Sequence, residues 1–401
     1  MTTQVHSNVG LKQLILGTQD QILIINFDGT KFTIAGRYTK PDWNPCWMLF
    51  KEPNLLYAID SMPDVGEVNL FKLVPDLSSK ASSTSSLPPP VGGPGTKASF
   101  DKLVLISSGK GSWGGAHIEF NAEKTRIVGS CYGSGMVDLW DVSATDGVPR
   151  VITSSAVPGQ VSPGQKRHHP HQAVLDPTGR HFIVPDLAGD KLLVINDGEG
   201  VRSNIYSNVV DVPIGVGPRH VAFITSPYGP HFLVMVAELS NEVFLYEAYY
   251  TGNTINLIEV DRKSSYGIGE PKDPSVAVAA ELVVAKNQRD IYVSNRFTGE
   301  KEDHIAHFHF RENGSFPYLE FIGLTPTMGL RPRTFCLSKD RMQEFVFVGN
   351  EVGESGLVAF ERNPFTGHID STPVATISNE ELNTPGISED MINGPQFVFQ
   401  I

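Results

Sequence analysis

The end of the chain constrains the fold most, because its last residues match the first strand of a repeat whose other strands open the sequence. This short apolar pattern, Pro395 to Ile401, has six earlier copies, at residues 46–50, 116–120, 172–175, 219–223, 281–284 and 333–337. Each copy is followed by two further strand patterns and a weaker fourth. Repeats of about 40 to 60 residues with four short strands are typical of β-propellers. The sequence therefore predicts an all-β, seven-bladed β-propeller with four antiparallel strands per blade, in which the C-terminal strand closes the ring by pairing into the first blade.

A single domain is predicted for residues 1–401, since a radial repeat lengthens the chain without enlarging any one core. The stretch at about 76–99 is rich in Ser, Pro and Gly and too poor in apolar residues to pack. We expect it to be a flexible insertion between strands. One or two helical turns are expected at most, between Glu380 and Met391.

Composition excludes several classes of protein. No apolar stretch approaches the ~18 residues that a membrane helix needs, and the N-terminus lacks the pattern of a secretory signal, so a cytoplasmic protein is predicted. The net charge of −12 argues against nucleic acid or anionic membranes as partners. The 3 cysteines are odd in number and scattered, which favours reduced thiols over disulfides or a zinc cluster. The oligomeric state is left open.

Polar residues gather where the first strand of a repeat begins and where the second strand ends. Because these two strands are antiparallel neighbours, both positions lie on one rim of the central channel. Exposed turns favour Gly, Asn, Asp, Ser and Lys, whereas these positions are rich in Arg, His and Glu. We therefore predict a polar site at this channel mouth. Its candidate residues are His117, His169, His171, Asp186, Arg219, His220, Glu238, Glu281, Arg296 and Arg333.

The histidines also have simpler explanations. Those of residues 168–171 could be ordinary turn residues or could bind a metal adventitiously. Pro170 favours an extended backbone that turns His169 and His171 to the same side, as two residues facing a channel require. No Cys or further His lies nearby at ligand spacing, so no metal and no other cofactor is predicted.

The arginines leave two interpretations open. They could be ion-pair partners of Asp186, Glu238 and Glu281. Converging from three blades on one end of a narrow channel, they could instead grip a carboxylate or phosphate through bidentate hydrogen bonds. Glu238 ends an apolar run, where a carboxylate is costly unless it is paired.

Several stretches resemble the seven-bladed β-propeller lactonase family, which includes propeller-type 6-phosphogluconolactonase and 3-carboxy-cis,cis-muconate cyclase. They are residues 169–187, 217–223, 238–241, 292–296, 333–335 and 360–367, and they follow in order through blades four to seven. The resemblance implies that His171, Glu238, Arg219 and Arg296 are catalytic. The spacing between Arg219 and Glu238 is longer than in the family, as is the stretch after Leu73.

The implied activity is that of a lactonase or cycloisomerase, which opens or forms a lactone on a small carboxylate held by arginines. Either direction places negative charge on oxygens that arginines stabilise, and either needs a group of near-neutral pKa, which His171 or Glu238 could be. One alternative is a cyclase or isomerase of specialised metabolism with a larger apolar substrate, its pocket lined by aromatic residues. Those residues are Trp43, Trp47, Trp113 and Tyr132. Another is a non-catalytic propeller that binds partner proteins, although only one Trp-Asp pair occurs.

Overall fold

The computed structural model of the chain describes residues 10–75, 99–196, 205–226, 229–313, 316–383 and 394–401. The insertion predicted at about 76–99 lies outside these residues except for residue 99, as does most of the stretch from Glu380 to Met391. One short helix, α1 (Asn379–Leu382), begins just before that stretch, and the side chain of Ser378 caps it by accepting a hydrogen bond from Glu381 N. The expected helical turn is thus present.

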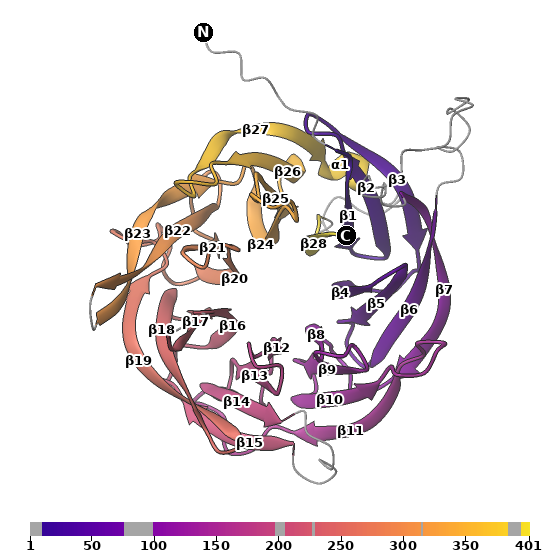
Figure 1. Cartoon of the computed structure of the whole chain (residues 1–401). Helices are drawn as coiled ribbons and strands as arrows, with labels where there is room; N and C mark the ends of the chain where they lie inside the picture. The colour runs from indigo at the N-terminus through magenta and orange to yellow at the C-terminus, as the bar shows by residue number, and fades with distance from the viewer. Residues whose placement is uncertain (1–9, 76–98, 197–204, 227–228, 314–315, 384–393) are drawn as a thin grey trace, which may run out of the picture.

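The described residues form seven antiparallel four-stranded sheets around a central channel (Figure 1). The first strands of the blades lie beside the channel. In blade order they are β28 (Phe397–Gln400), β4 (Pro45–Lys51), β8 (His117–Phe120), β12 (Val174–Leu175), β16 (Pro218–Ile224), β20 (Val278–Val284) and β24 (Leu330–Leu337). The second strands are β1 (Lys12–Thr18), β5 (Leu55–Asp60), β9 (Arg126–Cys131), β13 (His181–Asp186), β17 (His231–Ala237), β21 (Asp290–Arg296) and β25 (Phe345–Val352).

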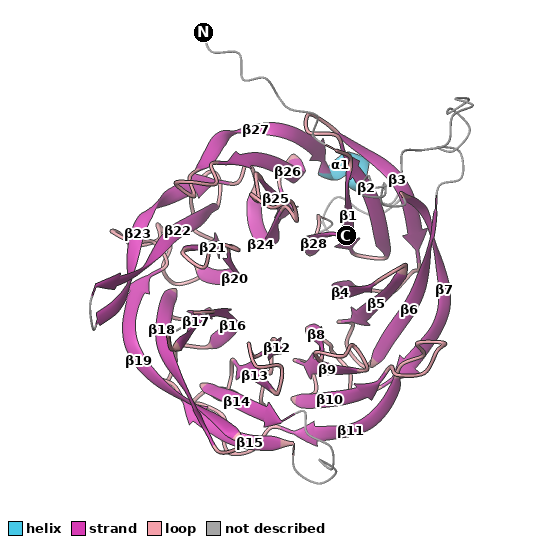
Figure 2. Cartoon of the chain, in the orientation of Figure 1, coloured by secondary structure: helices cyan, strands magenta, loops and turns pink. Residues whose placement is uncertain are grey.

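The outer half of each blade completes the sheet. The third strands are β2 (Gln21–Phe27), β6 (Glu67–Pro75), β10 (Met136–Asp141), β14 (Lys191–Asn196), β18 (Glu242–Thr251), β22 (His304–Asn313) and β26 (Ser355–Arg362). The fourth strands are β3 (Phe32–Thr39), β7 (Phe100–Lys110), β11 (Arg150–Ala156), β15 (Tyr206–Asp211), β19 (Thr254–Ser264), β23 (Phe316–Pro326) and β27 (Ile369–Ser378). Strands thus make up most of the described ring (Figure 2), and the predicted propeller is confirmed.

The C-terminal strand closes the ring. β28 pairs antiparallel with β1, from Leu14 opposite Gln400 to Gly17 opposite Phe397. Blade one therefore takes one strand from the end of the chain and three from its beginning, as the yellow and indigo ribbons show (Figure 1). This confirms the closure predicted from the C-terminal copy of the repeat.

The apolar core lies between neighbouring blades. Phe27 of blade one meets Phe345 and Phe347 of blade seven edge to face, with ring centroids 5.0 and 5.2 Å apart. Every residue of β13 and β21 is buried, since the second strands are covered on both faces. Burying a phenylalanine contributes ~1.5–3 kcal/mol, so seven such interfaces hold the ring rigid around the channel. No described helix is long and apolar enough to cross a bilayer, and all three cysteines are free thiols.

Candidate active site at the polar mouth of the channel

Two rings of side chains line a cavity of about 860 Å³ at one mouth of the channel. We call it the polar cavity. The first ring consists of residues at the ends of the second strands or within one residue of them: Gln19, Ser61, Tyr132, Glu238, Arg296 and Glu351. The second ring consists of Ala116, His171 and Gln396, which precede the first strands β8, β12 and β28, and of Arg333, which lies in the bulge near the start of β24. Strand starts and strand ends thus meet on one rim, as the sequence pattern predicted.

Bulges in the first strands give this mouth its charged side chains. On β16 the partners of Pro218 and His220 are consecutive residues of β17, so Arg219 is an extra residue that the ladder leaves unpaired. Arg333 holds the same position on β24. A bulge interrupts the alternation of a strand and re-aims a side chain. Arg219 can therefore reach Glu238, which lines the polar cavity, while its neighbour His220 contacts Glu281.

Glu238 is held between two arginines. Its Oε2 lies 2.7 Å from Arg219 Nε and 3.4 Å from Arg296 Nη2, and the Glu238 side chain is 19% exposed. Arg219 is the most buried of the three and also donates from Nη1 to the backbone oxygen of Ala280 at 2.7 Å. Arg219 Nε makes its ion-pair contact without a well-aligned hydrogen bond, and Arg296 Nε is buried without a hydrogen-bond partner among the described residues. Glu238 is thus a fixed carboxylate whose remaining surface faces the cavity.

The buried arginines create a positive potential. Burial and the neighbouring Arg296 lower the pKa of Arg219 to about 9, so its guanidinium is still cationic at pH 7. Burial likewise lowers the pKa of Arg296. Arg333 Nη1 lies 3.9 Å from Glu351 Oε1, which gives the site a second carboxylate. Crowded cations in a poorly solvated place are stabilised by an anion, so the cavity favours anionic or electron-rich oxygens.

His171 lies in the cavity wall as a neutral imidazole. Burial, and then the charge of Arg219, lowers its pKa well below the usual value. Its Nδ1 is buried and has no hydrogen-bond partner in the described part of the chain. His171 therefore does not titrate near neutrality, contrary to one expectation from the sequence. It is instead available at pH 7 as an uncharged base or hydrogen-bonding group.

Asp186 orders the loop that carries the histidines but does not line the cavity. Its carboxylate contacts His168 Nδ1 at 2.6 Å and accepts a hydrogen bond from His169 N at 2.7 Å. The hydrogen bond to Asp186 raises the pKa of His168. The ring of His169 stacks on Tyr132 with centroids 4.1 Å apart, and it too lies outside the cavity wall. Of the two histidines expected to face the channel, His171 lines the cavity.

Three other predicted residues lie deeper, in a layer that we call the channel floor. His220 Nδ1 is 2.8 Å from Glu281 Oε1, and the Trp47 ring lies 4.1 Å from His117 and 5.7 Å from His220. Burial lowers the pKa values of His117 and His220 well below the usual range and raises the pKa of Glu281 to about 7. Below this floor a second cavity of about 810 Å³ opens at the opposite mouth, and the two cavities share no lining residue.

The pairing of the arginines was only partly foreseen. Glu238 does pair with arginines, but Asp186 and Glu281 pair with histidines. The partner of Arg333 is Glu351, which was not among the predicted site residues. Like Glu238, it lies within one residue of the end of a second strand. The expected aromatic lining is divided, since Trp113 and Tyr132 line the polar cavity, Trp47 belongs to the floor, and Trp43 is fully buried in the core. Phe297 is a further aromatic residue of the cavity wall.

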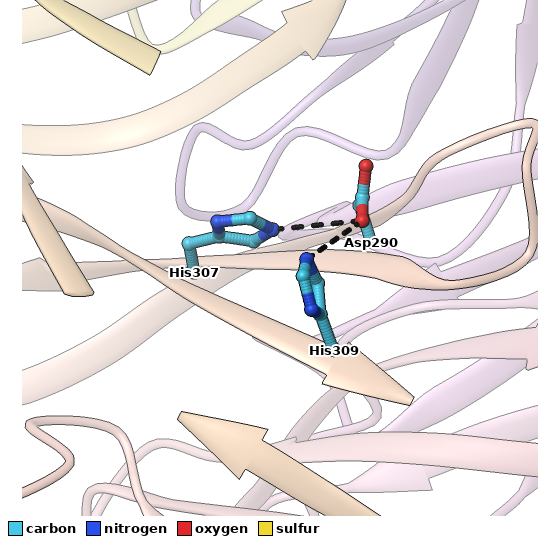
Figure 3. Close-up of side chains that lie close together, drawn as sticks. All are labelled: Asp290, His307 and His309. Atoms are coloured by element: carbon cyan, nitrogen blue, oxygen red, sulfur yellow. Dashed lines mark ion pairs between the residues drawn. The ribbon is translucent and has the colours of Figure 1, made fainter. Parts of the chain in front are cut away.

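Asp290, His307 and His309 lie close together (Figure 3), in an arrangement that could hold a metal ion, and none of them lines either cavity. Their ligand atoms lie within 4.8 Å of one another. The carboxylate of Asp290, however, already accepts hydrogen bonds from Arg289 Nε at 2.8 Å and Arg362 Nη2 at 2.5 Å. The two guanidinium groups neutralise the carboxylate charge that would otherwise attract a metal cation. The cluster therefore fits an ion-pair network that joins blades six and seven better than a metal site.

Comparisons with known proteins agree with this architecture. A sequence model of the family described as "Lactonase, 7-bladed beta-propeller" matches residues 13–381. A probable 6-phosphogluconolactonase of Arthroderma benhamiae is 28% identical over 198 residues, 49% of each chain. The 6-phosphogluconolactonase of Serratia proteamaculans is 27% identical over 195 residues, 48% of this chain and 54% of the relative. The matches thus span about half the length of these relatives.

A solved structure extends the likeness over the whole ring. The periplasmic gluconolactonase of Pseudomonas aeruginosa superposes with a TM-score of 0.75 at 19% identity, over 98% of this chain and 99% of that one. At this identity the likeness concerns the fold.

Proposed function

Since the chain belongs to the seven-bladed β-propeller lactonase family, we propose that the polar cavity is the active site of an enzyme that opens or forms a lactone on a small carboxylate substrate. The observation that carries this proposal is the Glu238 carboxylate held by Arg219 and Arg296 beside a neutral His171. The cavity thus contains a carboxylate (Glu238), a neutral imidazole (His171) and a further guanidinium (Arg333). These are the groups that acyl transfer to or from water requires.

Each residue has a distinct proposed role. In lactone opening, water adds to the ring carbonyl, and the negative charge that develops on the carbonyl oxygen is stabilised by Arg296 and Arg333. His171 or Glu238 takes the proton from the attacking water and later returns one to the leaving ring oxygen. Lactone formation from an unsaturated acid is a different reaction. A carboxylate oxygen of the substrate adds to one alkene carbon, and the other alkene carbon takes a proton from the protonated form of His171 or Glu238. Arg296 and Arg333 stabilise the negative charge that develops on the conjugated acid. Arg219, which is almost fully buried, acts as a positioning residue that holds Glu238.

The charges of the site favour a substrate with one negative charge. Three arginines (Arg219, Arg296 and Arg333) face two glutamates (Glu238 and Glu351), so the excess is a single positive charge. A carboxylate balances this charge, whereas a phosphate monoester carries about −1.5 to −2 at pH 7. We therefore propose an unphosphorylated, carboxylate-bearing lactone, although relatives are named 6-phosphogluconolactonase.

Steady-state assays with a panel of lactones test the proposal. We expect kcat/KM to be highest for carboxylate-bearing γ- or δ-lactones and at least about tenfold lower for neutral or phosphorylated ones. Glu351→Gln removes one negative charge from the site and should raise the relative kcat/KM for a phosphorylated lactone. No turnover of any lactone, in either direction, contradicts the proposed reaction. A preference for phosphorylated lactones contradicts the proposed substrate alone.

A larger apolar substrate remains a second candidate, because Trp113, Tyr132 and Phe297 line the same cavity. These three aromatic side chains offer ring faces for an extended hydrocarbon or conjugated body. Trp113→Ala distinguishes the two candidates. It should lower kcat/KM only for lactones with a bulky apolar substituent and leave small carboxylated lactones within about threefold of the wild type.

A further inference from the structure

The second cavity, at the opposite mouth of the channel, is lined by apolar side chains contributed by all seven blades. We call it the apolar cavity. The residues that follow the floor layer on the seven first strands occupy equivalent ladder positions, and all line this cavity. They are Leu49, Glu119, Val174, Ala222, Val283, Cys336 and Phe399. Six of these side chains are apolar or a thiol, so one carboxylate, that of Glu119, interrupts a ring that is otherwise hydrophobic.

Glu119 has little to stabilise its charge. Its Oε1 accepts one hydrogen bond, from Phe120 N at 2.8 Å, and no described cation forms an ion pair with it. A partly buried carboxylate without a counter-ion is costly, and folding alone does not require one at a position where the other blades carry Leu, Val, Ala, Cys or Phe. The described residues thus leave the Glu119 carboxylate able to accept a cation from outside the chain.

The wall around Glu119 suits an organic cation rather than a metal ion. Trp47, Phe50, Phe223 and Phe399 present partly exposed rings to the cavity. At its edge, the ammonium group of Lys339 already lies 5.9 Å from the centroid of the Phe399 ring. Aromatic faces attract ammonium groups and tolerate their alkyl substituents. A metal ion needs several oxygen or nitrogen ligands held close together, and no group of three described His, Cys, Asp or Glu residues at this cavity has that geometry.

We propose that the apolar cavity binds a small organic ammonium ion, with the cationic nitrogen against Glu119 and its apolar body against the aromatic wall. We infer this class of ligand because the cavity presents one carboxylate surrounded by aromatic and aliphatic side chains. This site is independent of the polar cavity, because the floor formed by Trp47, His117 and His220 separates the two.

Binding should depend on pH in a defined direction. Burial raises the pKa of Glu119 to about 7, while Phe120 N and the charge of Lys124 act in the opposite sense. The other ionisable groups that line the cavity are His117, Glu281, Lys124 and Lys339. Burial keeps His117 neutral near pH 7 by lowering its pKa, and burial raises the pKa of Glu281 to about 7. Affinity for an ammonium ion should therefore rise as Glu119 ionises between about pH 6 and pH 8.

Titration calorimetry of the full chain with benzyltrimethylammonium tests the proposal, with benzyl alcohol as the uncharged aromatic probe. At pH 8 we expect the ammonium probe to bind at least about tenfold more tightly than benzyl alcohol, the scale of one charge-assisted contact. Glu119→Gln should abolish that preference and flatten the pH dependence. Glu123→Gln is the matched control, since it removes an exposed carboxylate of the neighbouring turn that does not line the cavity.

Three outcomes overturn the proposal. The first is that benzyltrimethylammonium does not bind, and the second is that Glu119→Gln binds it as tightly as the wild type. In the third, Glu351→Gln rather than Glu119→Gln weakens binding, which places the cation in the polar cavity instead. Glu119→Gln must unfold cooperatively at the wild-type midpoint or above, and Glu281→Gln serves as a second variant of the same cavity. Its carboxylate is engaged by His220, so this change should weaken binding less than Glu119→Gln does.

Discussion

The two mouths of the channel are built from the same seven first strands, yet one is charged and the other apolar. The difference follows the regularity of the ladders. At the polar mouth the pairing is bulged on β4, β16, β20 and β24, whereas towards the apolar mouth β4 and β16 pair without interruption. A regular strand sends alternate side chains into the channel and the others into the core between blades. Only an irregular strand can place an extra charged residue such as Arg219 on the channel side.

Deleting Gln396 to Ile401 should have the largest effect, because one strand serves both mouths. The deleted segment supplies Gln396 to the polar cavity and Phe397 and Phe399 to the apolar cavity. Its loss leaves the inner edge of β1 unpaired, at a cost on the order of 5 kcal/mol or more. Urea denaturation of the truncated chain measures this cost. Cooperative unfolding at the wild-type midpoint would contradict ring closure by this strand.

Arg219→Lys should separate catalysis from stability. Lysine keeps the charge but cannot contact Glu238 and the Ala280 oxygen together, so kcat should fall by about 100- to 1000-fold with little change in melting temperature. Arg362→Lys is the matched control, because Arg362 is equally buried and pairs with Asp290 away from both mouths.

The control variant should melt at a lower temperature and keep its turnover per folded molecule. The reverse pattern, with Arg219→Lys destabilised and fully active, shows that Arg219 only stabilises the fold. Activity assays and thermal denaturation on the same preparations distinguish the two cases.

The pH profile tests whether His171 acts as a neutral base. Its pKa is depressed by burial and by Arg219, so the active neutral form persists through neutrality and is lost only in acid. We expect kcat to be flat from about pH 6 to 8 and to fall below that range, and His171→Ala to lower it about 100-fold and remove the acid limb. An acid limb that survives in His171→Ala and disappears in Glu238→Gln assigns proton transfer to Glu238.

A change in kcat near pH 7 would come from Glu281 rather than from His171. The pKa of Glu281 is raised to about 7 by burial, and its partner His220 lies beside Arg219. Such a change should disappear in Glu281→Gln and persist in His171→Ala.

Glu119→Gln should have the smallest effect and act on stability at the apolar mouth. Because the folded pKa of Glu119 is raised to about 7 from an unfolded value near 4.5, its contribution is fully present below pH 4.5 and is lost as the pH rises to 7. The variant has no carboxylate at this position and does not lose this stability. The difference in free energy of unfolding, variant minus wild type, should therefore grow by ~1–2 kcal/mol between pH 5 and pH 8. Equal pH dependence in both proteins shows that Glu119 is well solvated.

The repeat made much of the fold predictable from the sequence. Antiparallel pairing brings the start of a first strand and the end of a second strand to one rim, so Arg219, Glu238, Arg296 and His171 could be placed at one mouth before any coordinates. The roles given to them remain predictions. Glu351 lies at the same rim but was not chosen as a site residue, because the bulge that turns Arg333 toward it cannot be read from the sequence.

What the sequence alone determined was the number of blades, the closing strand and the charged rim, because these depend on period and alternation. The tertiary structure decided how deep each side chain lies in the channel and which charged side chains pair with one another. Asp186 lies behind the loop it orders, His117 and Glu281 face the apolar cavity, and Trp43 is in the core. These outcomes depend on how far each side chain reaches across the channel and on which neighbours desolvate it. Both are properties of seven blades packed together rather than of any one repeat.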